Sequence, residues 1–143
     1  MPQHFDGHFA GPVLLADCPL MKLQLRPYQQ AAVDAITKFF VGNPTGNPVI
    51  ELPTSAGKSL IQADFIASVM QQWPGQRILC LAHVKELVSQ NHAELMGYWP
   101  GAPSGINSAQ MGRRDLSDPI LFAMIQSVYK KPAALGWRDL III

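Results

Sequence analysis

The sequence predicts an α/β fold in which helices flank a parallel β-sheet. Short apolar runs of strand length alternate along the chain with stretches of helical spacing. Runs such as 78–82 and 140–143 are continuously apolar, which is typical of parallel strands covered on both faces. Strands that alternate with helices in this way form βαβ units with right-handed crossovers.

Composition places the chain among globular proteins. Of its 143 residues, 48% are hydrophobic and 15% are charged, a balance that excludes an intrinsically disordered chain. A chain of this length forms one domain and buries about two-thirds of its unfolded surface. The formal net charge is +1, so overall charge does not indicate a nucleic-acid partner, and any such site has to be a local patch.

The start of the chain is expected to differ from the rest. We expect residues 1–21 to be an N-terminal appendage with little fold of its own and residues 22–143 to form the domain. No basic segment precedes the apolar stretch 13–16, and no apolar run approaches the ~18 residues of a membrane span. Cys18 and Cys80 lack metal or redox spacing. These features indicate a cytoplasmic protein without a membrane partner.

The first half of the domain predicts two helices around one strand. A helix begins at Pro27, which suits a first turn, and runs to about residue 40, where Gly42 ends it. A loop then leads to a first strand at about 48–52. A second helix follows the small residues of the next loop and ends at about residue 72, before Trp73-Pro74-Gly75.

The second half predicts further strands separated by helices. The strands are expected at 78–82, 119–124 and 139–143. A helix from about 84 to 99 follows the first of these, and 100–108 is expected to be a loop. A short helix is expected at 126–131. The sequence contains no internal repeat or low-complexity segment.

The segment Leu52-Pro53-Thr54-Ser55-Ala56-Gly57-Lys58-Ser59 lies between the first strand and the second helix, where a phosphate-binding loop would lie. Backbone N–H groups of such a loop converge on an anion, and the helix N-terminus adds partial positive charge. Lys58 would reach the terminal phosphates, and the Ser59 hydroxyl would ligate Mg²⁺. The strict pattern has glycine where Leu52 stands, so an ordinary small-residue turn before a helix is the alternative interpretation.

Several segments together resemble the first RecA-like domain of superfamily 2 DEAD/DEAH-type helicases, with the closest likeness to RadD-like DNA-repair helicases. The motifs that carry the resemblance follow the order and spacing of that family and lie at 25–29, 53–59, 81–90 and 123–129. The resemblance covers roughly residues 22–143 and implies a partial RecA-like domain that binds ATP and Mg²⁺.

By this resemblance, the ATP site combines the first two motifs. Leu25-Arg26-Pro27-Tyr28-Gln29 is similar to the adenine-recognising Q motif, because an amide such as that of Gln29 can donate and accept toward a base edge. Arg26 would support the base or ribose. Motif I implies that Lys58 has the catalytic role and that the backbone cradle consists of Thr54, Ser55, Ala56, Gly57, Lys58 and Ser59. A glycine is more usual in this family where Ser55 stands.

The later motifs imply contacts with a nucleic-acid backbone. The candidate residues are His83, Lys85, Arg113, Gln126 and Ser127, and strand–helix junctions with nearby cations suit phosphate groups. Each also has a plain structural interpretation, such as a solvated helical Lys-Glu pair at 85–86 or solvated arginines at 113–114. The basic residues leave RNA open, and the likeness to RadD-like proteins favours DNA.

The resemblance also implies parts that lie beyond Ile143: the Asp-Glu-x-His box, the next strand and a second RecA-like domain with its arginine finger. We therefore expect these 143 residues to bind nucleotide without appreciable hydrolysis. The next strand of the family lies between the phosphate-loop strand and the last strand seen here. A gap is accordingly expected inside the sheet, with unpaired backbone groups and apolar faces beside it.

Two other interpretations remain open from the sequence. A phosphate-loop kinase or GTPase would share the loop, although no arginine-lined pocket for a nucleoside monophosphate is evident. A truncated, non-catalytic remnant that binds nucleotide or a partner is the other. Oligomeric state and translocation polarity are not indicated by the sequence.

Overall fold

The computed structural model describes residues 24–143, and the expected appendage at 1–21 lies outside these described residues. Its helices are α1 (Pro27–Gly42), α2 (Lys58–Gln72), α3 (Lys85–Tyr98) and α4 (Ile125–Val128), with 3₁₀ turns η1 (Ala109–Met111) and η2 (Pro132–Leu135). Its strands are β1 (Ile78–Ala82), β2 (Ser104–Ser108), β3 (Arg113–Arg114), β4 (Ile120–Met124) and β5 (Leu140–Ile142).

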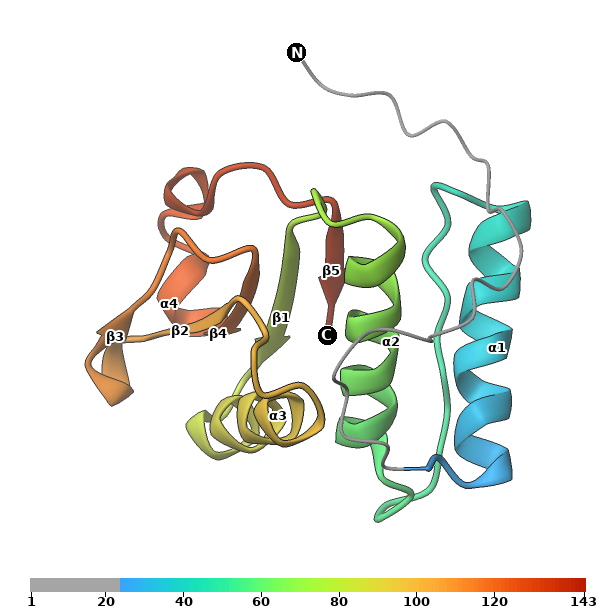
Figure 1. The fold of residues 1–143 in the computed structure, drawn as a ribbon. Helices are drawn as coiled ribbons and strands as arrows, with labels where there is room; N and C mark the ends of the chain where they lie inside the picture. Colours follow the sequence, from blue (N-terminus) through green and yellow to red (C-terminus); the bar gives the residue numbers. More distant parts are fainter. Residues whose placement is uncertain (1–23) are drawn as a thin grey trace.

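The strands form one five-stranded sheet in the order β3-β2-β4-β1-β5. β4 pairs in parallel with β1 and β2, and β5 pairs in parallel with β1, while the two-residue β3 is antiparallel to β2. The predicted α/β class with a mostly parallel sheet flanked by helices is therefore confirmed (Figure 1).

Helices cover both faces of the sheet. On one face, α2 and α3 pack over a core that includes Ile78, Phe122 and Leu95. On the other face, α4 and η2 cover a smaller core around Leu121 and Leu135. Helix α1 lies outside this arrangement, against α2 (Figure 1). Within the described part of the chain, no helix is both long enough and apolar enough to cross a membrane.

The predicted strand at 48–52 is wrong. These residues have no regular secondary structure, and Val49 is 92% exposed. A strand needs a neighbouring backbone to pair with. Among the described residues β5 pairs only with β1, so its other edge is open, and the segment 48–52 pairs with no strand. The sheet therefore ends at β5, and an open edge takes the place of the gap that was expected inside the sheet.

The predicted loop at 100–108 is also wrong in part, because its second half is strand β2. The sequence Ser-Gly-Ile-Asn-Ser looks like a turn, yet Gly105 to Ser108 are buried. Gly105 is required by close packing, since an added Cβ would lie 2.2 Å from the Asp118 carboxylate and 2.5 Å from the Asp115 Cβ. The other predicted strands and helices are present, with ends shifted by a few residues.

Candidate nucleotide and nucleic-acid sites

The loop before α2 is a tight turn with two residues in left-handed conformation. The Ala56 N–H donates to the Pro53 carbonyl at 3.2 Å. Ser55 has φ 67° and Gly57 has φ 74°. Ser55 stands where the family that the chain resembles more often has glycine. Its left-handed conformation is one that glycine adopts without steric cost. Ser55 is the one non-glycine residue with positive φ in residues 24–143.

Lys58 and Ser59 form the first turn of α2, next to this loop. The Leu60 and Ile61 N–H groups both turn back to the Gly57 carbonyl at 3.1 Å. The N–H groups of the first helical residues have no acceptor within the helix, so they can face an anion. The Lys58 side chain is exposed. The loop therefore ends in an exposed ammonium group beside the N–H donors of the first helical turn.

The Ser59 hydroxyl is oriented by helix α3. It donates to the Asn91 side-chain oxygen at 2.7 Å. Because its hydrogen is used in this bond, the hydroxyl oxygen has lone pairs left for a cation. This donor set fits a Mg²⁺ ion that arrives with a nucleotide, and it does not make a metal site alone. No group of three metal-ligating side chains occurs among the described residues.

Gln29 joins α1 to the loop from 27 residues away in sequence. Its side chain is 5% exposed. The amide oxygen accepts from the Arg26 N–H at 2.9 Å, and the amide nitrogen donates to the Ala56 carbonyl at 3.1 Å. The Tyr28 hydroxyl donates to the same carbonyl at 3.0 Å. Each end of the Gln29 amide is thus used once within the protein and has capacity for one more hydrogen bond.

The structure brings Gln29 to the 54–59 loop, and Arg26 adjoins this arrangement through the hydrogen bond from its backbone N–H to the Gln29 amide oxygen. Sequence reasoning missed two residues of this arrangement. Tyr28 has no pattern that would separate it from an ordinary helix residue. Asn91 did give a signal, since it is a polar residue at a position whose helical spacing directs it toward the sheet.

A second group of candidate residues lies where β1 and β4 end. The Gln126 amide donates to the His83 carbonyl at 3.0 Å, which connects the segments that follow these neighbouring strands. The Ser127 hydroxyl oxygen accepts from the Ala109 N–H at 3.2 Å. Gln126 and Ser127 line a cavity of about 280 Å³. His83, Gln126 and Ser127 are therefore brought together.

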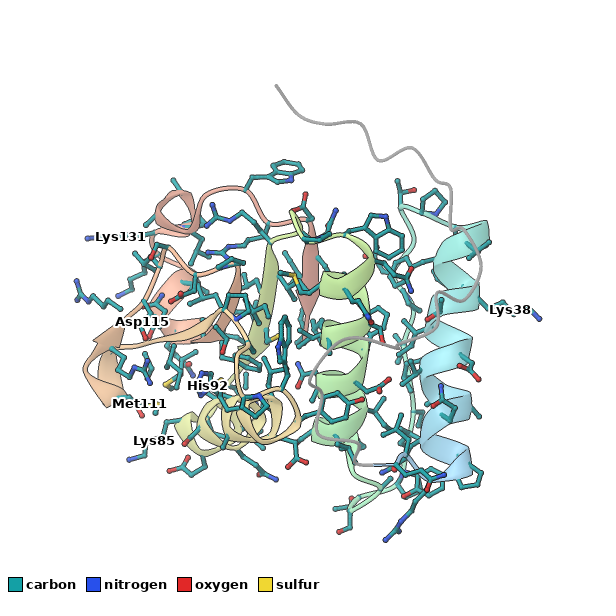
Figure 2. The ribbon with its side chains drawn as sticks, viewed as in Figure 1. Lys38, Lys85, His92, Met111, Asp115 and Lys131 are labelled. Atoms are coloured by element: carbon teal, nitrogen blue, oxygen red, sulfur yellow. The ribbon has the colours of Figure 1, made fainter. Side chains whose placement is uncertain are left out.

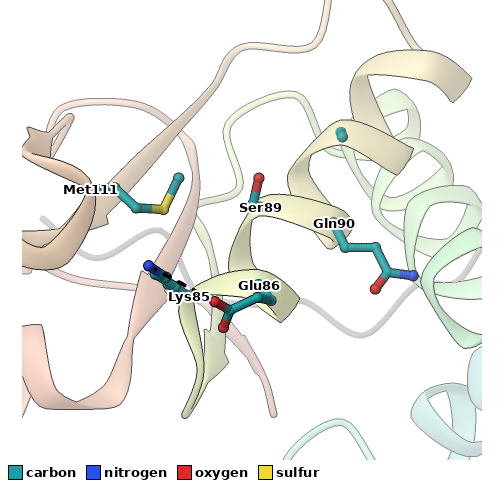
Figure 3. Close-up of a pocket in the computed structure, with 6 residues that line it drawn as sticks. Lys85, Glu86, Ser89, Gln90 and Met111 are labelled. Carbon is teal, nitrogen blue, oxygen red and sulfur yellow. Dashed lines mark ion pairs between the residues drawn. The ribbon is translucent and has the colours of Figure 1, made fainter.

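Lys85 lies apart from that cavity, beside another one. It lines a cavity of about 460 Å³ between α3 and η1, opposite Met111 (Figure 3). The Lys85 ammonium lies 3.9 Å from the Glu86 carboxylate, and both side chains are more than half exposed. Such an exposed pair contributes little to stability, so the ammonium is free to exchange partners.

Arg113 is engaged by a carboxylate. Its guanidinium forms an ion pair with Asp115. The hydrogen bond from the Ile106 N–H, and then that from Arg113, lower the pKa of Asp115. Arg113 is thus engaged elsewhere, and it is not among the residues that line the cavity beside Gln126 and Ser127.

These features define a class of protein. The sheet is mostly parallel and flanked by helices, and a turn leads into Gly-Lys-Ser at the start of a helix. This is the arrangement of a partial RecA-like, phosphate-loop domain. The chain belongs to the family described as "Type III restriction enzyme, res subunit", whose model matches residues 22–143.

This family is helicase-like and of superfamily 2, and its members are ATP-dependent enzymes of nucleic acids that generally use ATP and Mg²⁺. A comparison with curated proteins gave no match. The resemblance to superfamily 2 helicases is therefore confirmed at the level of the family.

Proposed function

We propose that this chain is the ATP-binding portion of an ATP-dependent DNA helicase or translocase of the RadD-like kind. The observation that carries the proposal is the turn at 53–57, with Gly57 in left-handed conformation directly before α2 and Lys58 exposed at its start. This is the geometry that presents N–H donors and an ammonium group to a triphosphate. The family match across 22–143 supports the same class of activity.

In this proposal the nucleotide spans two segments of the chain. Gln29, with the remaining donor and acceptor of its amide, meets the adenine edge, and Arg26 lies beside the base or ribose. The residues Thr54 to Ser59 surround the phosphates, and Lys58 neutralises charge on the terminal ones. Mg²⁺ bound with the nucleotide would supply Lewis acidity at the phosphate oxygens, and Ser59 would help to hold it.

The nucleic-acid backbone is proposed to pass the carboxyl ends of β1 and β4. His83, Gln126 and Ser127 would lie along one part of this path and Lys85 along another. Arg113 would contribute only after releasing Asp115. Contacts of this kind go to phosphate and sugar, so they position a strand without reading its sequence.

Nucleotide binding is the direct test of the proposal. A fluorescent ATP analogue would be titrated with Mg²⁺ into the full chain, its Lys58→Ala variant and a Lys38→Ala control. Lys38 is an exposed residue of α1 on the far side from α3 and β3 (Figure 2). Removing a charged hydrogen-bond donor should weaken binding about tenfold or more for Lys58→Ala, and the control should bind like the parent. Equal binding by all three would contradict the proposal.

Hydrolysis by these 143 residues is not expected. In phosphate-loop enzymes of this kind an acidic residue near Mg²⁺ is needed. Among the described residues, the Ser59 hydroxyl is bonded to the Asn91 amide, and no carboxylate forms an ion pair with Lys58. Phosphate release from ATP should stay at background. Turnover that is lost in the Lys58→Ala variant would show that this part of the proposal is wrong.

A further inference from the structure

The outer edge of β5 is open and apolar. Among the described residues, β5 pairs only with β1, so its other edge presents unpaired backbone N–H and carbonyl groups. The strand consists of leucine and isoleucine alone, and Ile141 is 55% exposed. Exposed sheet edges are commonly protected by charged side chains or proline, which discourage pairing with another strand. β5 carries neither, so this edge is suited to an added strand.

On one face, β5 borders a buried apolar cluster of helices α1 and α2. The cluster consists of Ala32, Val33, Ile61 and Phe65. Leu140 and Ile142 pack against it from β5, and Leu52 packs against it from the irregular segment 48–52. Ile141 lies between Leu140 and Ile142 in the strand, so its side chain points to the opposite face. A strand added at this edge would therefore meet apolar side chains on both of its faces.

The described chain begins beside the same cluster. Leu25 packs against the cluster that Leu140 and Ile142 border. Leu25 lies just before α1, and Figure 1 shows that α1 begins at the end of the molecule toward which β5 points. A segment that precedes Leu25 can therefore lie beside β5 and run in the same direction. Parallel pairing of this kind is what β1 already makes with both of its neighbours.

The sequence before residue 24 contains a run of the required kind. Pro12 is followed by the four apolar residues Val13-Leu14-Leu15-Ala16. A continuous apolar run is typical of a strand covered on both faces, and proline is accepted at the first position of a strand. The seven residues 17–23 connect this run to the described chain, and seven extended residues span up to about 23 Å. The three residues of β5 span only about 10 Å, so the connection is long enough.

We propose that residues 13–16 of this chain pair with the open edge of β5 as a further parallel strand. Their side chains would alternate between the cluster that Leu140 borders and the face that carries Ile141. The N-terminal appendage would then be ordered only through its contact with the domain. A second copy of the chain, paired through the same edge, is the competing occupant. The inference goes beyond the proposed function and does not depend on nucleotide binding.

Hydrogen–deuterium exchange of the full chain, followed by mass spectrometry, tests the pairing. In the parent, peptides that contain 13–16 and 140–142 should both be protected, to the same degree at low and high protein concentration. In Leu14→Asp a carboxylate would have to enter apolar surroundings, so both peptides should exchange about tenfold faster or more. Leu20→Asp makes the same substitution in the connecting residues and should leave both peptides as protected as in the parent.

Every other result would overturn the inference. Rapid exchange of 13–16 in the parent would show that this run is not a strand, and this observation needs no variant that might fail to fold. Protection of 140–142 that is unchanged in Leu14→Asp would assign the edge to another occupant. Protection that rises with protein concentration would identify that occupant as a second copy of the chain. Equal losses in Leu14→Asp and Leu20→Asp would show that the run 13–16 has no special part in the protection.

Discussion

Substitution of Gly57 by alanine tests the geometry of the phosphate loop most directly. Gly57 has φ 74°, and an added Cβ would lie 2.4 Å from the Gln29 amide nitrogen. The substitution therefore strains the backbone and displaces the side chain that holds the Ala56 carbonyl. Gly97, in α3, provides a matched control, because nothing lies within 4 Å of its added Cβ and it has no positive φ.

The magnitude follows from these contacts. A left-handed conformation costs an L-residue about 1–2 kcal/mol. Loss of the hydrogen bond from Gln29 to Ala56 costs about 1 kcal/mol more. Alanine also makes the unfolded chain less flexible than glycine does, which offsets about 0.4–1 kcal/mol of this destabilisation. Gly57→Ala should thus lower the free energy of unfolding by about 2 kcal/mol, whereas Gly97→Ala should raise it by up to about 1 kcal/mol because alanine favours a helix.

Urea and thermal unfolding followed by circular dichroism measure both changes in stability, and titration of the ATP analogue measures nucleotide binding by the loop. We expect the melting temperature of Gly57→Ala to fall by roughly 6–10 °C and its nucleotide binding to weaken. If Gly57→Ala were as stable as Gly97→Ala and bound nucleotide like the parent, the left-handed turn and its packing against Gln29 would not be the structure of this loop in solution.

Three further predictions concern other parts of the domain. Asn91→Ala should weaken binding of the Mg²⁺–nucleotide complex about fivefold, because the Ser59 hydroxyl loses the acceptor that orients it. Binding of metal-free nucleotide should change little. Titrations with and without Mg²⁺ compare these two affinities. Burial raises the pKa of Asp64, and the hydrogen bond from Tyr98 opposes this rise. The raised pKa stabilises the fold below the usual pKa of about 4, and this stabilisation is lost as pH rises through the raised value. Asp64→Asn should therefore flatten that part of the curve of stability against pH, which urea unfolding measures. Arg138→Met should destabilise the domain by about 3 kcal/mol, since its guanidinium donates to four backbone carbonyls, and a melting temperature equal to that of the parent would contradict this.

The parts of the fold that could be predicted from the sequence are those that local chemistry determines. β1 and β4 are continuously apolar because α-helices or turns cover both of their faces, and this pattern is visible in the sequence. The start of α2 is equally visible in the sequence. Gly57 suits the left-handed conformation before the helix, and Lys58 and Ser59 supply the side chains of a phosphate-binding loop.

The two errors have one physical cause, which is that strand formation depends on neighbours. The segment 48–52 is apolar but has no partner strand, so it stays irregular. β2 is turn-like in composition, yet β4 on one side and β3 on the other provide its partners. Its buried polar residue Ser108 donates to the Met124 sulfur at 3.1 Å, a contact that no local pattern reveals.

Candidate residues can be named from the sequence, but the direction in which each side chain points cannot. Residue types and spacing indicated Arg113 and Arg114 as a pair, but only the register of β3 separates them, and a shift of one residue would exchange their faces. The sequence predicts that the Gln29 amide serves a ligand, and the structure shows it bonded to the loop. Sequence patterns thus indicate which chemistry is present, and long-range pairing decides where each group points.

Helix α3 relates the two candidate sites to each other. Lys85 is its first residue, and Asn91, which accepts from Ser59, lies less than two turns later, roughly 9 Å along the helix axis. Because α3 is packed against the sheet through Val88 and Leu95, this separation is set by a helix anchored through its buried face and not by a flexible loop. A nucleotide at Ser59 and a strand at Lys85 would therefore be held at a fixed spacing by one rigid element. A motion that changes this spacing has to break the hydrogen bond between Ser59 and Asn91 or move α3 against the sheet. Breaking the hydrogen bond disrupts far less packing than moving the helix.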